Sequence, residues 1–152
     1  MMSETTIKWL AGVGGAVASY LFGGWTSLLG TLALFAFFDY VTGFIAAGKE
    51  GKLNSNVGWQ GIAKKIGMFV LLAVCHHVDT RLPLVLPFMD FMEGKSVLRD
   101  GATAAFLVNE ALSIVENCRR LGVRIPPFLD RSLDQLRNKT EEADKHDDQA
   151  RG

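Results

Sequence analysis

The amino-acid sequence predicts an all-α integral membrane protein with about four transmembrane helices and a short amphipathic helix near the C-terminus. The first observation is an apolar front, because no charged side chain occurs between Trp9 and Phe38. The second is a polar end, since nearly every residue from Thr140 onward is polar or charged. The uncharged front is longer than the about 20 residues that one crossing needs. It therefore holds more than one helix.

Composition excludes several classes of function. The 16 Lys and Arg balance the 16 Asp and Glu, so no overall field favours a nucleic acid or an acidic substrate. Cys75 and Cys118 form neither a disulfide framework nor a metal-ligand spacing. His76 and His77 lack a second ligand cluster that would complete a metal site. We therefore predict a protein that is no enzyme, with no metal, no cofactor and no nucleic-acid partner.

The apolar front is predicted to form two helices, over residues 7–22 and 25–47, because a pair of glycines interrupts it. A lysine, the apolar run after it and an Ala-Val-Ala sequence at 16–18 imitate a signal peptide and its cleavage site. The run is rich in glycine and continues well beyond that site. This favours a retained transmembrane segment.

Small residues recur every four positions in the first predicted helix, namely Ala11, Gly15, Ser19 and Gly23. Such a ridge lets another helix backbone approach closely. The contact can lie within one subunit or between subunits, and the sequence favours neither. Gly43, in the second predicted helix, is assigned the same packing role.

The segment after the second helix is basic and rich in glycine, and we expect it to form an elbow at the cytoplasmic membrane surface. Four glycines between positions 48 and 61 argue against one continuous helix, and Asn54 or Ser55 suits a helix N-cap. Trp59 and Ile62 suit the headgroup region. The lysines expected to hold the elbow at the surface are Lys49, Lys52, Lys64 and Lys65.

Two further helices follow. A third apolar run covers residues 66–78 and is short for a full crossing. A loop with two prolines is predicted from Arg81 to Gly101, partly packed on the membrane surface. A fourth helix is predicted over about residues 98–118.

The C-terminal region divides into a helix and a tail. After two prolines, leucines recur at the spacing of a short amphipathic helix, at Leu129, Leu133 and Leu136. We therefore divide the chain into a transmembrane domain at 1–125, an amphipathic helix at 126–138 and a charged disordered tail at 139–152.

The distribution of Lys and Arg predicts the orientation. The elbow is basic, and Arg119, Arg120 and Arg124 follow the fourth helix, whereas the loop between the third and fourth helices is nearly neutral. Four crossings place both basic segments on one side, which the positive-inside rule assigns to the cytoplasm. Both termini are then cytoplasmic.

A polar stripe runs along the fourth predicted helix. At about 100° per residue, one face collects Asn109, Glu110, Ser113, Glu116, Asn117 and Arg120. A carboxylate that faces lipid costs about 2.5–3.5 kcal/mol. We therefore expect this stripe to face water or polar partners.

Three arrangements satisfy that expectation. In the first, Glu110 and Glu116 pair with Lys or Arg at the cytoplasmic interface and anchor the helix. In the second, the stripe packs inward in the single subunit against Asp39 or Asp79, which would suit a proton relay. In the third, the stripe is hidden in a packed oligomer and lines a hole when the subunits rearrange. The residues assigned to this hydrophilic face are Asp39, Asn109, Glu110, Ser113, Glu116 and Asn117.

Two stretches carry a resemblance to a known family, FDYVTGFIAAGKEGKLNSNVGWQGIAKKIG and VNEALSIVENCRRLGVRIPPFLDRSLDQL. The chain resembles the phage lysis holins of the group that includes the clostridial toxin-secretion holin. The matching positions are Asp39, Tyr40, Thr42, Gly43, Gly51, Lys52, Leu53, Ser55, Gly61, Lys64, Lys65, Glu110, Ser113, Ile114, Glu116, Asn117, Leu121, Gly122 and Pro126.

The resemblance implies a homo-oligomer in the lipid bilayer of the bacterial cytoplasmic membrane, encoded by a bacteriophage or prophage. Its lesions depolarise the membrane and let a cell-wall hydrolase (an endolysin), or in relatives a large toxin, reach the wall, which causes host cell lysis. Two other functions stay open from the sequence. One is a small-ion channel or a proton-linked transporter subunit, and the other is a scaffold that binds a membrane complex through its C-terminal helix.

Overall fold

The structure of the chain is a computed structural model that describes residues 3–85, 94–132 and 134–135. Four long helices follow one another along this part of the chain: α1 (Glu4–Phe22), α2 (Ser27–Lys49), α3 (Ser55–Val85) and α4 (Val97–Leu121). The described residues contain no strand. The predicted all-α class is therefore confirmed.

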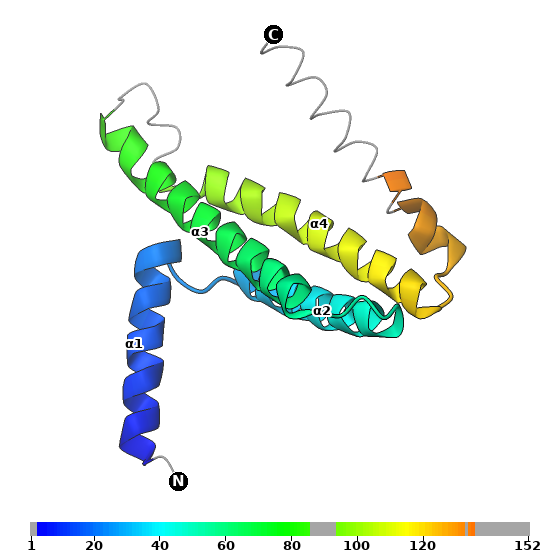
Figure 1. Cartoon of the computed structure of the whole chain (residues 1–152). Coiled ribbons are helices and arrows are strands. Elements are labelled where there is room, and N and C mark those ends of the chain that lie inside the picture. Colours follow the sequence, from blue (N-terminus) through cyan, green and yellow to red (C-terminus); the bar gives the residue numbers. More distant parts are fainter. Residues whose placement is uncertain (1–2, 86–93, 133, 136–152) are drawn as a thin grey trace.

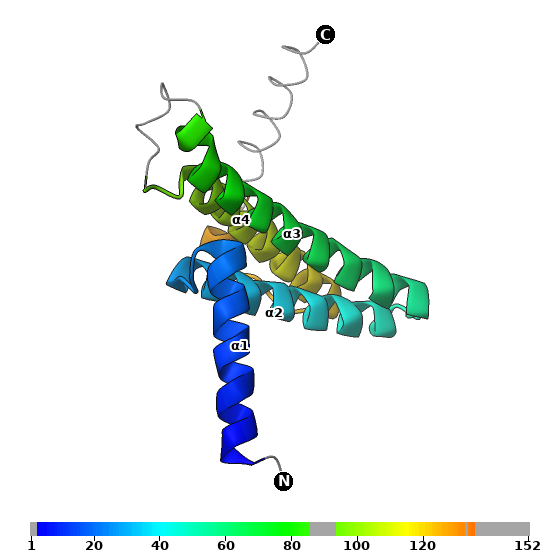
Figure 2. The ribbon, with the colours of Figure 1, turned by 90° about the vertical axis from the view of Figure 1, so that its left-hand side faces the viewer.

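Helices α2, α3 and α4 form a bundle, and α1 leads away from it (Figure 1). The view turned by 90° shows the same separation of α1 (Figure 2). No residue of α1 is buried. α1 meets the bundle at its C-terminal turn, where the rings of Phe22 and Phe69 pack edge to face with their centroids 6.2 Å apart.

Local sequence signals explain where α1 and α2 begin and where α1 ends. Ser3 and Thr26 are N-caps, because their side-chain oxygens accept the backbone N–H of Thr6 and Leu29 at 3.2 Å. α1 ends at Gly23, which has a φ of 71°, and the next glycine has a φ of 111°. Side chains with a Cβ rarely adopt such values, and the predicted break at this glycine pair is confirmed.

α3 is longer than the sequence predicts. The apolar run covers 66–78, but α3 begins already at Ser55, where the sequence predicts an N-cap at Asn54 or Ser55. The predicted break after α2 is therefore confined to residues 50–54, and the rest of the basic segment up to residue 65 is helical. Gly61 lies against Tyr40 of α2, where an added Cβ would come within 3.3 Å of the ring. Glycine costs about 1 kcal/mol relative to alanine inside a helix, and the close contact between α2 and α3 offsets that cost.

The predicted loop over 81–101 is shorter in the structure. α3 continues through Pro83 to Val85, and α4 begins at Val97. Pro83 removes one helical hydrogen bond, but it lies close to the end of α3, where few turns remain to be disturbed. The middle of the predicted loop, residues 86–93, lies outside the described residues.

The apolar core lies between α2 and α3. Leu32 and Leu72 have no exposed surface and form its centre. The other buried members are Leu29, Ala36 and Met68. Partly buried apolar side chains pack against them from α1, α3 and α4, namely Phe22, Phe69, Ala102, Phe106 and Leu107.

Two helices in the described part of the chain are long and apolar enough to cross a membrane, Ser27–Lys49 and Gly58–Val85. In the most apolar 18-residue stretch of each helix, only 17% and 11% of the residues, respectively, are buried inside the molecule. A core helix of a soluble protein buries its apolar face, so this low burial fits helices that face lipid. Length and composition thus support two crossings of the predicted four.

The C-terminal helix falls partly within the described residues. Residues 127–132 are helical, and the backbone N–H groups of Leu129 and Asp130 donate to the Pro126 carbonyl at 3.0 and 3.1 Å. Leu133 and Leu136, on which the amphipathic prediction depends, lie outside the described residues. The predicted tail at 139–152 also lies outside them.

Candidate functional site

Three charged side chains from three helices meet inside the bundle. Lys65 of α3 contacts Asp39 of α2, with Nζ 2.7 Å from Oδ2, and the same Nζ contacts Oε2 of Glu110 from α4. These side chains are largely buried, since 14% of Asp39, 19% of Lys65 and 8% of Glu110 is exposed. We call these residues the ion triad. One ammonium serves two carboxylates, which meets the rule that buried charges are paired.

Asn117 of α4 extends this network along the interface between α2 and α4. Its Nδ2 donates to Oδ1 of Asp39 at 3.0 Å and to Oγ1 of Thr42 at 3.3 Å. Its Oδ1 accepts from Nη1 of Arg120 at 2.9 Å. Gly43 makes room for this amide, because an added Cβ would lie 3.2 Å from Asn117 Nδ2. The amide is thus satisfied on both sides, and α2 and α4 approach closely.

The network ends in exposed ion pairs at the start of the turn between α2 and α3. Nε of Arg120 donates to Oε1 of Glu50 at 2.8 Å, and Nζ of Lys52 lies 3.1 Å from Oε2 of Glu50. Hydrogen bonds from Arg120 first, and then from Lys52, lower the pKa of Glu50 to about 2. Glu50 is therefore ionised throughout the physiological range of pH.

Lys49 closes the C-terminal end of α4. Its Nζ donates to the carbonyl oxygens of Leu121 at 2.8 Å and Arg120 at 3.3 Å, and α4 ends at Gly122 with a φ of 88°. An ammonium here meets carbonyls without helical partners and the negative end of the helix dipole. The basic turn after α2 and the C-terminus of α4 thus lie at the same end of the bundle.

A groove of about 950 Å³ opens beside the ion triad, between α2, α3 and α4. We call it the polar groove. Within it, Glu110 and Asn117 are buried, Ser113 is half-buried, and Asn109 and Glu116 are exposed. It is lined by all the residues assigned to the hydrophilic face, Asp39, Asn109, Glu110, Ser113, Glu116 and Asn117.

These positions bear on the arrangements predicted for the stripe. Glu110 pairs with Lys65 inside the bundle and not with a cation at its surface. Asn117 reaches Asp39, so the stripe faces inward against that residue. Asp79, the other partner considered, lies away from the polar groove and binds the opposite end of α4.

The four lysines predicted to form the elbow occupy different environments. Lys49 lies at the C-terminus of α2, and Lys52 lies in the turn after it. Lys64 and Lys65 belong to α3, and Lys64 lines the polar groove. The ammonium of Lys65 binds two carboxylates inside the bundle that are distant in sequence, and the anchoring of the elbow at a membrane surface stays a prediction.

The predicted packing residues also differ from one another. Ala11, Gly15 and Ser19 are exposed, so these three positions of the ridge are not packed within the single subunit, and their use between subunits stays a prediction. Gly23 lies against α3, where an added Cβ would come 2.5 Å from Cε1 of His76. Gly43 lies against α4, as described above.

A second polar cluster holds the N-terminal end of α4. Asp79 of α3 is 1% exposed and accepts the backbone N–H groups of Leu98 and Arg99 at 3.0 and 2.9 Å. Because Ser96 makes no side-chain cap, Asp79 performs the capping role from another helix. Nη1 of Arg99 donates to the Phe22 carbonyl at 2.5 Å. Sequence reasoning missed both roles, since no local pattern links a carboxylate to a helix that begins about twenty residues later.

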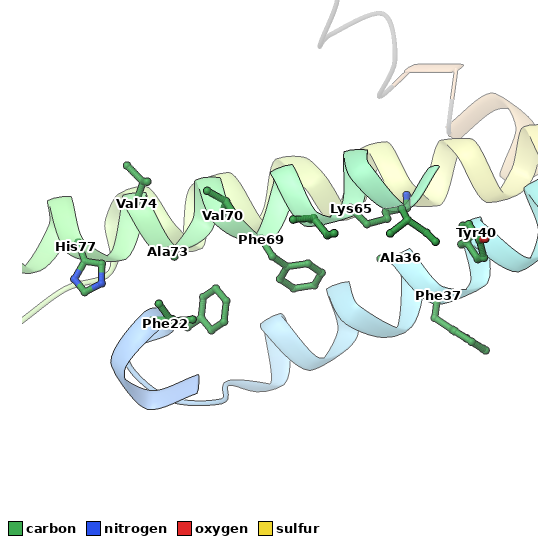
Figure 3. Close-up of a pocket in the computed structure, with 13 residues that line it drawn as sticks. Phe22, Ala36, Phe37, Tyr40, Lys65, Phe69, Val70, Ala73, Val74 and His77 are labelled. Atoms are coloured by element: carbon green, nitrogen blue, oxygen red, sulfur yellow. The ribbon is translucent and has the colours of Figure 1, made fainter. Parts of the chain in front are cut away.

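An apolar groove of about 630 Å³ lies between α2, α3 and the end of α1. Figure 3 shows Phe22 beside Phe69, with Val70 and Val74 further along α3. Lys65 lines this groove as well as the polar groove. Its side chain therefore stands at the boundary between an apolar surface and a polar one.

The polar groove offers hydrogen bonds and fixed charges to water, to ions or to another protein surface. Among the described residues, no group of three or more His, Cys, Asp and Glu is placed to hold a metal ion. The groove lies beside α2 and α3, the helices that are apolar enough to cross a membrane. The charged and amide side chains in this groove are unsuited to lipid tails.

Comparison with known proteins gives consistent matches over most of the chain. The model of the bacteriophage holin family matches residues 16–138. An uncharacterised protein of Halalkalibacterium halodurans is 38% identical over 134 residues, which are 88% of this chain and 96% of that protein. A probable holin of Bacillus phage phi105 is 30% identical over 134 residues, 88% of this chain and 91% of the phage protein. No solved structure matches the chain.

Proposed function

The chain belongs to the bacteriophage holin family, and we propose that it acts as a holin in the bacterial cytoplasmic membrane. The resemblance carried by the two sequence stretches is confirmed at the level of the family. In this proposal, copies of the chain assemble into lesions that depolarise the membrane. The lesions let an endolysin, or in relatives a large toxin, cross to the cell wall and cause host cell lysis.

The polar groove is the observation that carries this proposal. It contains carboxylates, amides and ammonium groups beside two apolar helices. Each carboxylate exposed to lipid costs about 2.5–3.5 kcal/mol, so this surface is stable in a membrane when it faces water or another subunit. A homo-oligomer whose subunits turn their grooves toward a common opening satisfies that requirement.

The ends of the helices support an orientation within this proposal. Lys49 contacts the C-terminus of α4, so the basic turn after α2 and the arginines in the last turn of α4 share one end of the bundle. The positive-inside rule assigns that end to the cytoplasm. With α4 as a third crossing and α1 as a fourth, both termini are cytoplasmic, as the sequence predicts.

The test is induced expression in a bacterium that also makes a cytosolic cell-wall hydrolase without a signal sequence. Membrane potential and culture turbidity are followed together. We expect abrupt depolarisation, with rapid clearing of the culture only when the hydrolase is present. Depolarisation without release of the hydrolase would overturn the proposal of a hole wide enough for protein.

A pair of variants connects the test to the polar groove. Ser113→Leu places an apolar side chain in the groove, and we expect normal membrane insertion with delayed or abolished clearing. Ala104→Leu adds similar bulk at an exposed position of α4 outside the groove lining, and we expect wild-type behaviour. Equal lysis times for the two variants would show that the groove does not line the lesion.

The second candidate function is a small-ion channel or a proton-linked transporter subunit. The ion triad favours it, because charged residues that meet between membrane helices mark ion pathways in many pumps and channels. This function predicts depolarisation or proton flux while the hydrolase stays inside the cell. The hydrolase experiment therefore separates the two functions.

A further inference from the structure

We propose that the ion triad is a closing contact that keeps α2, α3 and α4 together in the single subunit, and that it must break before the polar groove can line a lesion. This inference rests on the proposed function and adds a control on when the lesion forms. It gives Lys65 a regulatory role, as the cation that masks two carboxylates of the groove.

The position of the ion triad supports this role. Asp39, Lys65 and Glu110 come from the three helices that border the polar groove, so the contacts of one Nζ atom connect all three. Lys65 also borders the apolar groove. Loss of its two contacts would free its side chain to move away and would separate the helices on both sides of the polar groove.

The contacts that fix α4 should be lost in one step and not gradually. The residues that α4 buries are polar or charged, namely Arg99, Thr103, Glu110 and Asn117. Their hydrogen bonds and ion pairs are directional and weaken steeply when the distance or the angle changes. A helix whose buried side chains are all polar keeps its place until these contacts break.

Breaking the ion triad costs free energy, and this cost is lower when other subunits are close by. Opening of the polar groove therefore depends on how many subunits the membrane holds. When Lys65 leaves, Asp39 and Glu110 lose their cation, and an uncompensated carboxylate is unfavourable inside a membrane. Water in a forming lesion, or the polar groove of a neighbouring copy, supplies the missing compensation. Isolated subunits therefore remain closed, and assembled subunits open together after a delay.

A purely structural triad predicts the opposite outcome for the same substitutions. If the triad served only to stabilise the subunit, its removal would weaken the fold and would delay or abolish depolarisation. If it is a closing contact, neutral replacement of all its charges should shorten the delay, because no carboxylate is left uncompensated and no ion pair has to break.

The experiment compares the time from induction to depolarisation in wild type and two variants. The first variant combines Asp39→Asn, Lys65→Met and Glu110→Gln, and the second carries Glu110→Gln alone and keeps the pair of Lys65 with Asp39. Both are compared at equal amounts of protein in the membrane fraction. We expect depolarisation roughly twofold or more earlier in the triple variant, since less compensation is needed to shift the population. The single variant should fall between the two.

Glu4→Gln is the matched control for Glu110→Gln. Glu4 forms an exposed pair with Lys8 on α1, and 90% of its side chain is exposed. The control makes the same chemical change outside the bundle, so we expect the wild-type delay. An equal shift in Glu4→Gln and Glu110→Gln would overturn the proposal, because the shift would then follow from charge alone.

A second measurement follows the groove directly. In a background with Cys75→Ala and Cys118→Ala, the substitution Ser113→Cys places a thiol in the polar groove. Its labelling by a membrane-impermeant maleimide is measured in inverted vesicles prepared before depolarisation. We expect faster labelling in the triple variant than in the triad-intact background, and equal labelling would overturn the closing role.

The outcomes separate this inference from the function on which it rests. If wild type never depolarises the cell, the proposed function fails, and the labelling experiment still decides whether the triad closes the groove. If wild type lyses cells but neither variant acts earlier, the holin role stands and the closing role is wrong. If the triple variant does not accumulate, the closing role is judged from Glu110→Gln, by its time to depolarisation and by the labelling rate of Ser113→Cys in that background.

Discussion

Helices α2 and α4 have similar lengths, 23 and 25 residues, but they are buried through opposite chemistry. α2 buries Leu29, Leu32, Ala36, Ala46 and Ala47, all of them apolar. α4 buries Arg99, Thr103, Glu110 and Asn117, all of them polar or charged. One helix is therefore packed by shape, and the other is positioned by specific partners.

The difference in burial indicates that α4 is the helix that can move. In a bilayer the lipid tails are as apolar as leucine, so apolar packing supplies close contact without a hydrophobic drive between helices. Polar contacts fix one relative position of two helices, and each such contact is made by only a few side chains. We therefore expect α4 to respond strongly to single substitutions of its partners on α2 and α3, whereas α2 should respond in proportion to lost volume.

The largest effect is expected from Lys65→Met. It leaves Asp39 and Glu110 buried without their shared cation, and removal of one partner of a buried ion pair costs about 3–5 kcal/mol. We expect little folded protein in the membrane fraction, measured by quantitative immunoblot. Lys64→Met removes the neighbouring ammonium, which is not part of the ion triad, and should accumulate normally. Normal accumulation of Lys65→Met would contradict the difference drawn between α2 and α4, because the position of α4 would then not depend on the ion triad.

A large effect is also expected from Leu72→Ala in the apolar core. Leu72 has no exposed surface, and such truncations cost about 2–5 kcal/mol, through lost contacts and the cavity left behind. We expect a lower unfolding temperature in detergent. Leu72→Met keeps the volume and should cost less than about 1.5 kcal/mol. If both variants lost the same stability, packing by shape would be the wrong account of the interface between α2 and α3.

A smaller effect is expected from Asp79→Ala at the N-terminal end of α4. The change removes the carboxylate that accepts the backbone N–H groups of Leu98 and Arg99. Loss of an N-cap costs about 0.5–2 kcal/mol. Hydrogen exchange at the first turn of α4 should increase, with less change at the C-terminal turn that Lys49 holds. An equal increase in exchange at both ends of α4 would show that the two ends are not held independently.

The smallest effect is expected from Glu50→Gln at the exposed end of the network. Bonds from Arg120 and Lys52 lower the pKa of Glu50 from its usual 4.5 to about 2. Any stability from this carboxylate is therefore present above about pH 4.5 and is lost as pH falls toward 2. The pair is exposed and screened by solvent, so the variant should differ only slightly from wild type at neutral pH. Unfolding in detergent across this range should show that difference vanish, and a difference that grew in acid would contradict the assignment.

The positions of the helices were largely predictable from local signals. The glycine pair after α1 and the N-cap of α2 are short-range features, and each works through its own backbone. The extent of α3 was not predictable in the same way. The glycines of this segment suggest that the helix is interrupted, but Gly61 is tolerated in α3 because Tyr40 of α2 packs against it.

The candidate site shows the same division. Helical periodicity gathered Glu110, Asn117 and their neighbours on one face, and the polar groove contains that face. Lys65 read as a membrane-surface anchor, because a lysine beside an apolar run commonly serves that purpose. Its role in the ion triad depends on two carboxylates, 26 positions before it and 45 positions after it, and no local pattern reports such a meeting.

The helical class, the apolar runs, the polar stripe and membership of the holin family can be recognised in the amino-acid sequence. These follow from hydropathy, periodicity and motif order, which depend on residues close together in the chain. The tertiary structure decided which charges meet, which helix ends are capped by Asp79 and Lys49, and that α4 is held by polar contacts. Pairing of charges depends on distances in space across several helices, and for that reason it appears only when the helices are packed.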